Sequence, residues 1–319
     1  MPGKKLKKIV SDIKALKIQG AGKVRIAVVE ALKREAFESR AGSAEKLRNE
    51  IKQGMLLFLN SRATEPEMRT ALRVILRAVQ SKTDSVHELK QKIISACNNY
   101  ESDRKKALEK IAEFGSGIIP KGAVVFTHCH SNTVEEILKR AWKERRLKEV
   151  ICTETRPKMQ GHITAENLAK FGIPVTIIAD SAAYPLMHGA DLLITGADAI
   201  LANGDVVNKI GTAQISLAAA KENVPHYVAC SSHKFDPLTT FGEEEIIEER
   251  PPLEIWEKKM KNLKIRNPAF DITRATCIRE IICELGCLAP ASFAAIVYER
   301  LGLDRHSEAD FSIIKLFRR

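Results

Sequence analysis

The stretch Ala-Val-Val-Phe-Thr-His-Cys-His-Ser-Asn-Thr fills residues 123–133 and carries two different signals. Its first four residues are apolar, its remainder carries polar or thiol side chains, and a helical spacing of apolar residues follows. A short, uninterrupted apolar run is typical of a strand that is buried on both faces. The stretch therefore predicts a buried strand that ends where a helix begins, with reactive side chains in the turn between them.

The same arrangement recurs further along the chain, where short apolar runs alternate with helical stretches. These runs are Val150–Cys152, Val175–Ala179, Leu192–Thr195 and Tyr227–Cys230. Strands that alternate with helices predict an α/β fold whose mostly parallel, Rossmann-like sheet is covered on both faces. Ligands of such a sheet bind beyond the carboxyl ends of its strands.

Upstream of Gly115 the apolar residues follow a helical period instead. One stripe runs through positions 6, 9, 10 and 13, and another runs through positions 68, 72, 75, 76 and 79. Spacings of three and four residues predict amphipathic helices. With 319 residues, the chain is long enough for two domains. We expect an all-helical domain over residues 1–117 and a Rossmann-like catalytic domain over residues 118–319.

Composition excludes several classes of protein. The chain is 45% hydrophobic and 29% charged, as globular proteins are. No apolar run approaches the length of about 18 residues that indicates a membrane span, so no membrane association is expected. The lysine-rich start, Met1–Lys8, lacks the apolar core of a secretory signal. Seven cysteines without disulfide-scaffold spacing fit reduced thiols, so we expect a cytoplasmic protein.

The net charge of +11 is concentrated at the N-terminus, where residues 1–50 carry 13 basic and 6 acidic side chains, a difference of +7. A basic balance favours anionic partners such as phosphorylated metabolites, nucleic acid or an anionic surface, although a solvated basic face is equally compatible with it. Aromatic residues make up only 5%, which argues against a stacking platform for single strands. Nucleic acid is therefore the least favoured partner.

Polar clusters follow the five apolar runs. They occupy residues 127–133, 154–156, 180–181, 196–198 and 231–234. Because the carboxyl ends of parallel strands meet at one edge of a sheet, these clusters should line one crevice.

Two residues of these clusters are candidates for acid–base chemistry. Cys129 precedes a predicted helix that starts near Asn132, and a helix N-terminus with nearby cations lowers a thiol pKa from about 8.5. Cys129 is therefore predicted to supply a thiolate as a base or nucleophile, the alternative being a small buried side chain. Asp198 follows an apolar run, where desolvation can hold a carboxyl protonated as a general acid. The alternative for Asp198 is a turn-forming role.

A metal site at His128-Cys129-His130 is not expected. In an extended segment, alternation directs both histidines to one side and Cys129 to the other. No residue with zinc-ligand spacing follows.

Several segments suit anionic groups. Gly20–Lys23 and Ser131–Thr133 each lie at a predicted helix start, where free amides attract phosphate. Asn208 and Lys209 also precede a helix, and Arg62 and Lys234 are available cations. A plain turn or a solvated surface is the alternative at each position. The candidates are Gly20, Ala21, Gly22, Lys23, Arg62, Ser131, Asn132, Thr133, Asn208, Lys209 and Lys234.

Together these segments resemble the superfamily of the aldose-1-phosphate isomerases and the regulatory subunits of the initiation-factor 2B exchange factor. The most specific stretches are residues 154–161, 196–198, 202–212 and 267–273. The resemblance covers nearly the whole chain and implies a helical domain followed by an α/β domain. The isomerases carry the pair that corresponds to Cys129 and Asp198, which the regulatory subunits characteristically lack. An enzyme is therefore favoured over a regulatory subunit.

Among these enzymes, residues 130–133 and 232–236 are most similar to the isomerases of ribose 1,5-bisphosphate, and those of methylthioribose 1-phosphate are the alternative. The resemblance implies conversion of a doubly phosphorylated aldose into ribulose 1,5-bisphosphate, without metal or redox cofactor. Cys129 would act as the base and Asp198 as the acid through an enolate-type intermediate, and the anion-binding candidates would contact substrate. A homo-oligomer, from a dimer to a hexamer of dimers, is also implied. A nucleotide activator stays an open alternative.

Overall fold

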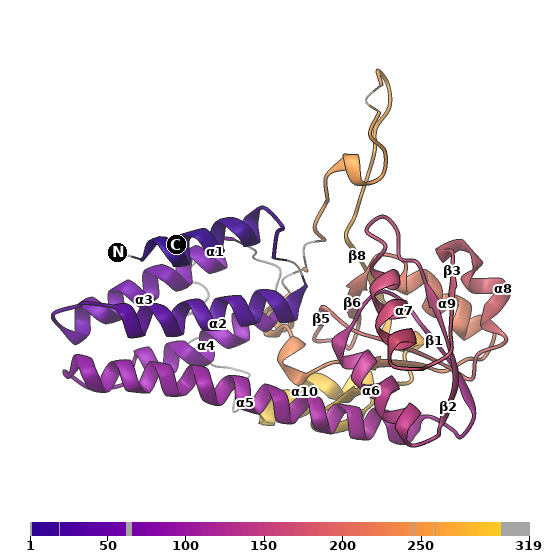
Figure 1. Cartoon of the computed structure of the whole chain (residues 1–319), viewed down its shortest axis with the longest axis horizontal. Helices are drawn as coiled ribbons and strands as arrows, with labels where there is room; N and C mark the ends of the chain where they lie inside the picture. Colours follow the sequence, from indigo (N-terminus) through magenta and orange to yellow (C-terminus); the bar gives the residue numbers. More distant parts are fainter. Residues whose placement is uncertain are drawn as a thin grey trace. The chain divides into compact units, whose positions relative to one another are not determined.

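The computed structural model describes residues 2–18, 20–61, 66–242, 244–245, 247–258 and 260–300. The described chain divides into two compact units between Lys106 and Ala107 (Figure 1). This division falls within the long helix α5 (Val86–Ile118), whose last residues also include the predicted boundary at residue 117.

Every element of secondary structure described in the first unit is a helix, which confirms the predicted helical N-terminal region. Two helices bury the apolar stripes predicted for them: α1 buries Leu6, Val10 and Ile13, and α4 buries the stripe from Met68 to Val79. Ser43 caps one helix by accepting a hydrogen bond from the amide of Lys46. Besides the first part of α5, the helices are α1 (Lys4–Lys14), α2 (Ala21–Glu38), α3 (Ala44–Leu59) and α4 (Pro66–Val79).

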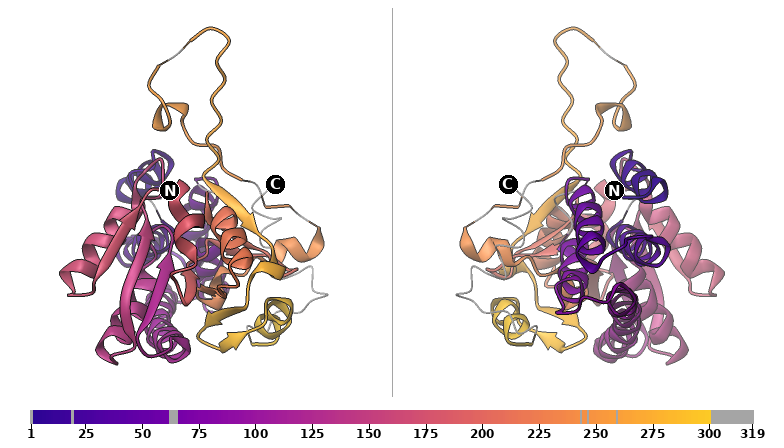
Figure 2. Two further views of the ribbon diagram at one scale, coloured as in Figure 1. Left: turned by 90° about the vertical axis from the view of Figure 1, so that its right-hand side faces the viewer. Right: turned by 90° about the vertical axis from the view of Figure 1, so that its left-hand side faces the viewer.

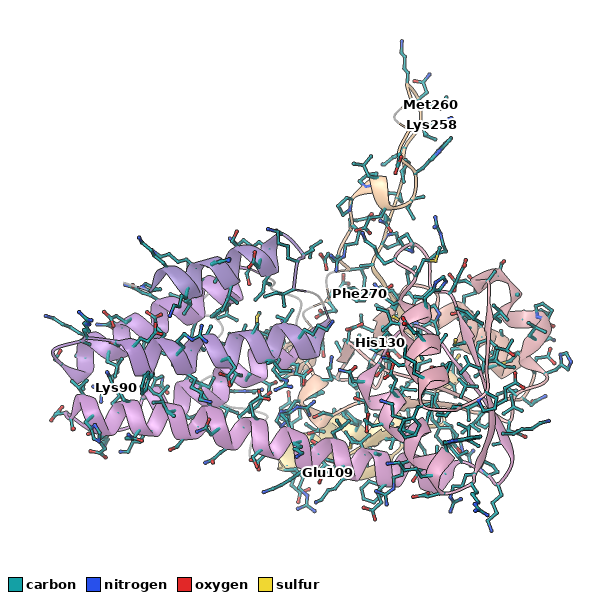
Figure 3. The ribbon with its side chains drawn as sticks, viewed as in Figure 1. Lys90, Glu109, His130, Lys258, Met260 and Phe270 are labelled. Carbon is teal, nitrogen blue, oxygen red and sulfur yellow. The ribbon has the colours of Figure 1, made fainter. Side chains whose placement is uncertain are left out.

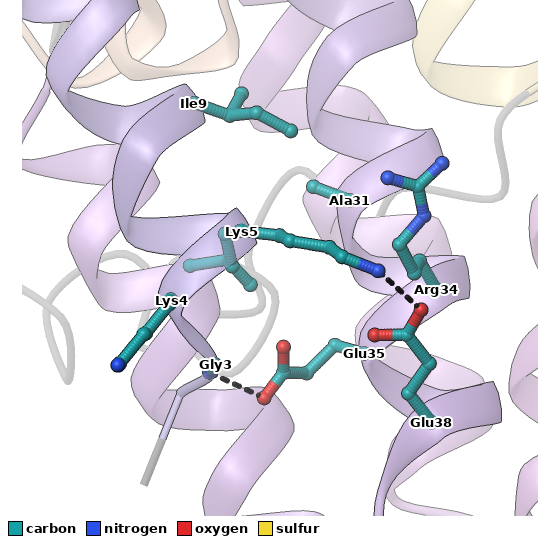
Figure 4. Close-up of a pocket in the computed structure, with 9 residues that line it drawn as sticks. Gly3, Lys4, Lys5, Ile9, Ala31, Arg34, Glu35 and Glu38 are labelled. Atoms are coloured by element: carbon teal, nitrogen blue, oxygen red, sulfur yellow. Dashed lines mark hydrogen bonds and ion pairs between the residues drawn. The ribbon is translucent and has the colours of Figure 1, made fainter.

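Polar contacts around a small pocket hold the start of α1 against α2 (Figure 4). The amide of Gly3 donates to Glu35 Oε1 at 2.8 Å, and Lys5 Nζ lies 2.9 Å from Glu38 Oε1. On α3, a Cβ at Gly54 would lie 2.9 Å from a Leu6 methyl group. A glycine at position 54 therefore lets α1 and α3 approach closely.

The second unit is built on a seven-stranded sheet in the order β10-β9-β7-β4-β1-β2-β3. Every neighbouring pair is parallel except β9 with β10, which form an antiparallel hairpin. All five predicted strands are present, so the predicted α/β fold with a mostly parallel sheet is confirmed. The strands are β1 (Ala123–Thr127), β2 (Leu147–Thr153), β3 (Val175–Ile178), β4 (Leu192–Thr195), β7 (His226–Ala229), β9 (Glu280–Cys283) and β10 (Gly286–Leu288).

Helices cover both faces of this sheet, which explains why its central strands β1 and β4 are apolar at consecutive positions. Val134 and Ile137 of α6 and Leu168 of α7 pack in one core cluster. Met187 and Ile215, from α8 and α9, pack with Phe126 in another cluster. The helices are α6 (Asn132–Lys143), α7 (Gln160–Lys170), α8 (Ala183–Met187), α9 (Thr212–Lys221) and α10 (Pro290–Arg300). Short 3₁₀ helices cover Asp180–Ala182, Ser232–Lys234, Pro237–Phe241, Pro252–Glu254 and Ala275–Cys277.

Sequence patterns did not predict two features of this unit. A second, three-stranded antiparallel sheet is formed by β5 (Ala199–Ile200), β6 (Val206–Lys209) and β8 (Phe270–Thr273). Between β7 and β8 an arm extends away from the rest of the unit (Figure 2), and Lys258 and Met260 lie near its tip (Figure 3). None of the described helices combines the length and apolarity that crossing a bilayer requires.

Candidate functional site

The five polar clusters lie at one edge of the sheet. Strands β3, β2, β1, β4 and β7 are neighbours in this order and run parallel, so their carboxyl ends point the same way. Since each cluster follows one of these strands directly, the topology gathers them along the edge where ligands of such sheets bind.

The loop after β1 turns sharply at Cys129, whose φ is +68°. Few residues other than glycine adopt this conformation, and surrounding contacts must hold it. Two threonines do so, because the amide of Cys129 donates to Thr155 Oγ1 at 2.9 Å and Thr164 Oγ1 donates to the carbonyl of Cys129 at 3.0 Å. The segment is not extended, so the predicted alternation of its side chains is wrong.

The histidines on either side of Cys129 have separate partners. Buried His128 contacts Thr153 Oγ1 and the carbonyl of Ile210, at 2.6 and 3.0 Å. His130 Nδ1 lies 3.0 Å from Glu135 Oε1 (His130 is labelled in Figure 3). Throughout the described residues, no three histidine, cysteine or acidic side chains gather as metal ligands would.

The carboxylate that holds His130 is itself buried at the start of α6. Burial acts to raise the pKa of Glu135, but hydrogen bonds from His130 and Asn167 outweigh this effect, and the net shift is downward. Glu135 is therefore an ionised side chain that fixes the ring of His130 next to the Cys129 turn.

Burial keeps the thiol of Cys129 in its neutral form. Burial raises the pKa of Cys129 to about 12, although the charge of Lys209 and the amide of His130 act to lower it. The predicted lowering of this pKa is therefore wrong, because desolvation outweighs the nearby cation. The carboxylates of Asp198 and Asp180 also lie close enough to act on the thiol, and they raise its pKa further. The structure thus brings Cys129, Asp198 and Lys209 within electrostatic reach of one another.

Asp198 is half-buried in the short connection between β4 and β5. Its amide donates to the carbonyl of Val207 at 2.8 Å, which ties this connection to β6. Two residues earlier, a Cβ on Gly196 would lie 2.8 Å from Ser131 Oγ. The absence of a side chain at Gly196 therefore lets the Asp198 connection lie directly against the start of α6.

Asn208 and Lys209 end β6 beside the start of α9. Buried Asn208 donates through Nδ2 to Thr212 Oγ1 at 3.0 Å, and Lys209 Nζ lies 4.9 Å from the centre of the Phe270 ring. The N-terminus of α9 is capped by a carboxylate of the same chain. Asp271 Oδ2 accepts a hydrogen bond from the amide of Gly211 at 2.7 Å. Its carboxylate also accepts from the amide of Ala213.

The remaining predicted residues fall in three places. Ser131 caps α6 by accepting from the amide of Val134, and Asn132 and Thr133 form the first turn of that helix. Lys234 is buried in the 3₁₀ helix after β7. In the helical unit, Gly20 precedes α2 with a φ of +83°, and α2 begins with Ala21, Gly22 and Lys23. Arg62 lies outside the described residues.

Three supporting residues were not identified from the sequence. Thr155 receives the Cys129 amide, and Asp180 accepts from the amides of Thr155 and Arg156 at 2.8 and 2.7 Å. Asp271 caps α9. The polar clusters contain Thr155 and Asp180, so their position at strand ends was a usable signal. For Asp271 the only signal was its place in the stretch 267–273.

Asp271 gives the stability of the protein a measurable pH dependence. Burial raises its pKa from 3.8 to about 6, despite the amide hydrogen bonds from Gly211 and Ala213. Between these values the folded protein holds a proton that the unfolded chain has released, so this group makes unfolding easier as pH rises from about 4 to about 6. We expect Asp271→Asn to remove this contribution, as measured by urea unfolding at several pH values. If the free energy of unfolding changed with pH in Asp271→Asn as it does in the wild type, this assignment to Asp271 would be wrong.

A model of the initiation factor 2 subunit family matches residues 17–290. The chain belongs to this family. Among family relatives, a Thermococcus kodakarensis protein named ribose 1,5-bisphosphate isomerase is 38% identical over 307 residues, which cover 94% of this chain and 95% of the relative.

Two solved structures of the family share the fold. A 5-methylthioribose 1-phosphate isomerase from Pyrococcus horikoshii is 26% identical with a TM-score of 0.80, covering 94% of this chain and 88% of that one. A translation initiation factor eIF-2B from the same organism is 28% identical with a TM-score of 0.78, covering 90% and 98%. Four curated relatives that are 36–38% identical to this chain are named isomerases. This member of the initiation factor 2 subunit family is an isomerase.

Proposed function

We propose that this chain converts ribose 1,5-bisphosphate into ribulose 1,5-bisphosphate, with Cys129 and Asp198 as its acid–base pair. The observation that supports the proposal is geometric: Cys129 and Asp198 follow the neighbouring parallel strands β1 and β4, and His128, next to Cys129, contacts the carbonyl of Ile210, which directly follows Lys209. The name of the Thermococcus relative, which matches over nearly the full length of both chains, supports this choice of substrate.

The substrate sets a specific chemical problem. Its anomeric oxygen carries a phosphate, so the sugar ring does not open through a free hemiacetal. Opening instead requires a proton on the ring oxygen, and isomerisation requires a base at C2. The pair therefore has to present an acid and a base at once. We propose that one shared proton serves both tasks: in the substrate complex it moves from the thiol of Cys129 to the carboxyl of Asp198, and the charge of Lys209 favours the thiolate that this transfer leaves.

The proposed cycle returns both groups to their starting state. Asp198 gives its proton to the ring oxygen as the bond from this oxygen to C1 breaks. Cys129 takes the proton from C2, and the electron pair of that bond forms a double bond between C1 and C2. The resulting enol phosphate receives the thiol proton at C1, while the hydroxyl on C2 returns a proton to Asp198 and becomes the ketone.

The phosphates of the substrate require cations and free amides near this pair. Lys209 and Lys234 supply charge, and the first turn of α6, at Ser131–Thr133, supplies amides at a helix N-terminus. The start of α9 is unsuitable for a phosphate because Asp271 occupies its amides. We propose that a substrate phosphate binds at α6 rather than at α9.

Methylthioribose 1-phosphate is a second candidate substrate, favoured by the likeness to the Pyrococcus isomerase. It carries one phosphate where ribose 1,5-bisphosphate carries two. We expect the purified chain to form ketose from ribose 1,5-bisphosphate with the higher kcat/KM. The two substrates are compared at equal concentrations by following ketose formation. A preference for methylthioribose 1-phosphate would transfer the assignment to that substrate, and no turnover of either would favour a regulatory subunit.

A further inference from the structure

A single buried histidine lies between the loops that carry the proposed acid–base pair and Lys209. His128 follows β1, next to Cys129, and is only 1% exposed. Its Nε2 lies 3.0 Å from the carbonyl oxygen of Ile210, which immediately follows Lys209, and its Nδ1 lies 2.6 Å from Thr153 Oγ1. The ring thus joins the Cys129 turn to the end of β2 and to the connection between β6 and α9.

The partners of the ring determine its protonation. A carbonyl oxygen only accepts hydrogen bonds, so Nε2 carries a proton and donates it to Ile210. Burial lowers the pKa of His128, so the ring is neutral and Nδ1 accepts from the hydroxyl of Thr153. Both ring nitrogens are therefore satisfied in the neutral state, which is the condition for a rigid buried contact.

The backbone at Gly211 packs closely against one edge of the ring. A Cβ on Gly211 would lie 3.2 Å from Cε1 and Nε2 of His128, closer than ordinary van der Waals contact. Gly211 has a φ of +101°, which side-chain-bearing residues rarely adopt. The ring of His128 therefore lies directly against the peptide backbone that leads from Lys209 into α9.

We infer that His128 is a positioning residue of the isomerase site, whose Nε2–H bond to the carbonyl of Ile210 holds Lys209 beside the thiol of Cys129. The inference rests on the proposed function. His128 moves no proton to substrate; it fixes the two loops between which the thiol and the cation meet. A misplacement of about 1 Å in such a site can reduce turnover by about 10²-fold.

Two substitutions separate this role from simple packing. The side-chain nitrogen of glutamine reaches about as far as Nε2, so His128→Gln keeps a donor for Ile210, whereas that of the shorter asparagine reaches only as far as Nδ1. We expect His128→Asn to lower kcat by about 10²-fold and His128→Gln to stay within about tenfold of the wild type. Equal losses in the two variants would overturn the inference. If the asparagine variant does not fold, the glutamine variant alone decides. A loss of about 10²-fold in kcat in His128→Gln would also overturn the inference.

The reactivity of Cys129 gives a readout that needs no substrate. Releasing the loop has two opposed effects on the pKa of the Cys129 thiol: loss of the nearby Lys209 charge raises it, and entry of water lowers it. Burial is the larger of the two causes in the intact protein, so the net pKa should fall. Alkylation of Cys129 by iodoacetamide at pH 8 should then become about tenfold faster in His128→Asn, one pKa unit being a tenfold change. Turnover and thiol reactivity then change in opposite directions. The rate is followed at Cys129 by mass spectrometry of its peptide.

His226→Gln is the matched control. His226 is 2% exposed and also contacts two hydroxyl groups, those of Thr195 and Ser216. We expect this variant to lose thermal stability and to keep the alkylation rate of Cys129 within twofold of the wild type. An unchanged rate in His128→Asn, or an equal rise in His226→Gln, would overturn the inference. A wild type that isomerises neither sugar contradicts the proposed function instead, and the alkylation comparison still decides the role of His128.

Discussion

Replacing Cys129 with serine is expected to lower the turnover of ribose 1,5-bisphosphate by about 10²- to 10⁴-fold, the range for loss of a general acid or base. Serine keeps the size and the polar atom of the side chain, but its hydroxyl is a far weaker acid than a thiol and does not supply the base. Asp198→Asn is expected to cause a loss in the same range, because an amide donates no proton to the ring oxygen. Neither change removes Lys209, Lys234 or the amides of α6, so substrate should still bind.

Steady-state kinetics with binding measured separately by calorimetry checks this expectation. The matched control is Cys277→Ser, because Cys277 is a free, half-buried cysteine of the same unit that lies in a 3₁₀ helix outside the proposed site. Its turnover should stay within twofold of the wild type. Near-full activity in Cys129→Ser or in Asp198→Asn would remove the proposed mechanism, and loss of binding in both variants would assign the pair to substrate binding.

Much of the fold was predictable because parallel strands covered on both faces leave a local signature. The runs around Val125, Val150 and Leu193 are apolar at consecutive positions, which neither an amphipathic helix nor a half-exposed strand requires. Their parallel order then determines which edge the polar clusters share. This explains why Cys129 and Asp198, which are 69 residues apart in the sequence, were expected in one crevice and lie within electrostatic reach.

The ionisation of the site was not predictable in the same way. A helix start and a neighbouring lysine are local features, and both favour a thiolate at Cys129. Desolvation in the folded chain outweighs both features, so the pKa rises instead, and a local sequence pattern does not indicate how deeply a thiol will be buried. The capping of α9 by Asp271 depends likewise on the pairing of β6 with β8, which are separated by about 60 residues including the arm. No local pattern indicates such a pairing.

Replacing Gly161 with alanine is expected to cost about 3 kcal/mol or more in the free energy of unfolding, at the upper end for overpacked sites. A Cβ at Gly161 would lie 1.7 Å from the carbonyl oxygen of Thr153, a distance that no rotamer relieves because both atoms belong to backbone-defined positions. The amide of Gly161 also donates to the carbonyl of Glu154 at 3.2 Å. Alanine must therefore push the start of α7 away from the end of β2.

This displacement would reach the proposed site as well as the core, because the end of β2 carries Thr153, the partner of His128, and leads to Thr155, which binds the Cys129 amide. Thermal unfolding should show a fall of about 10 °C for a unit of this size, together with reduced turnover at temperatures where the variant is still folded. Gly117→Ala is the matched control: nothing lies within 4 Å of its Cβ, and it belongs to α5, where alanine is favoured by about 0.5–1 kcal/mol. A Gly161→Ala variant as stable and as active as Gly117→Ala would mean that α7 and β2 separate without strain, and that the threonines at the end of β2 do not hold the Cys129 turn in place.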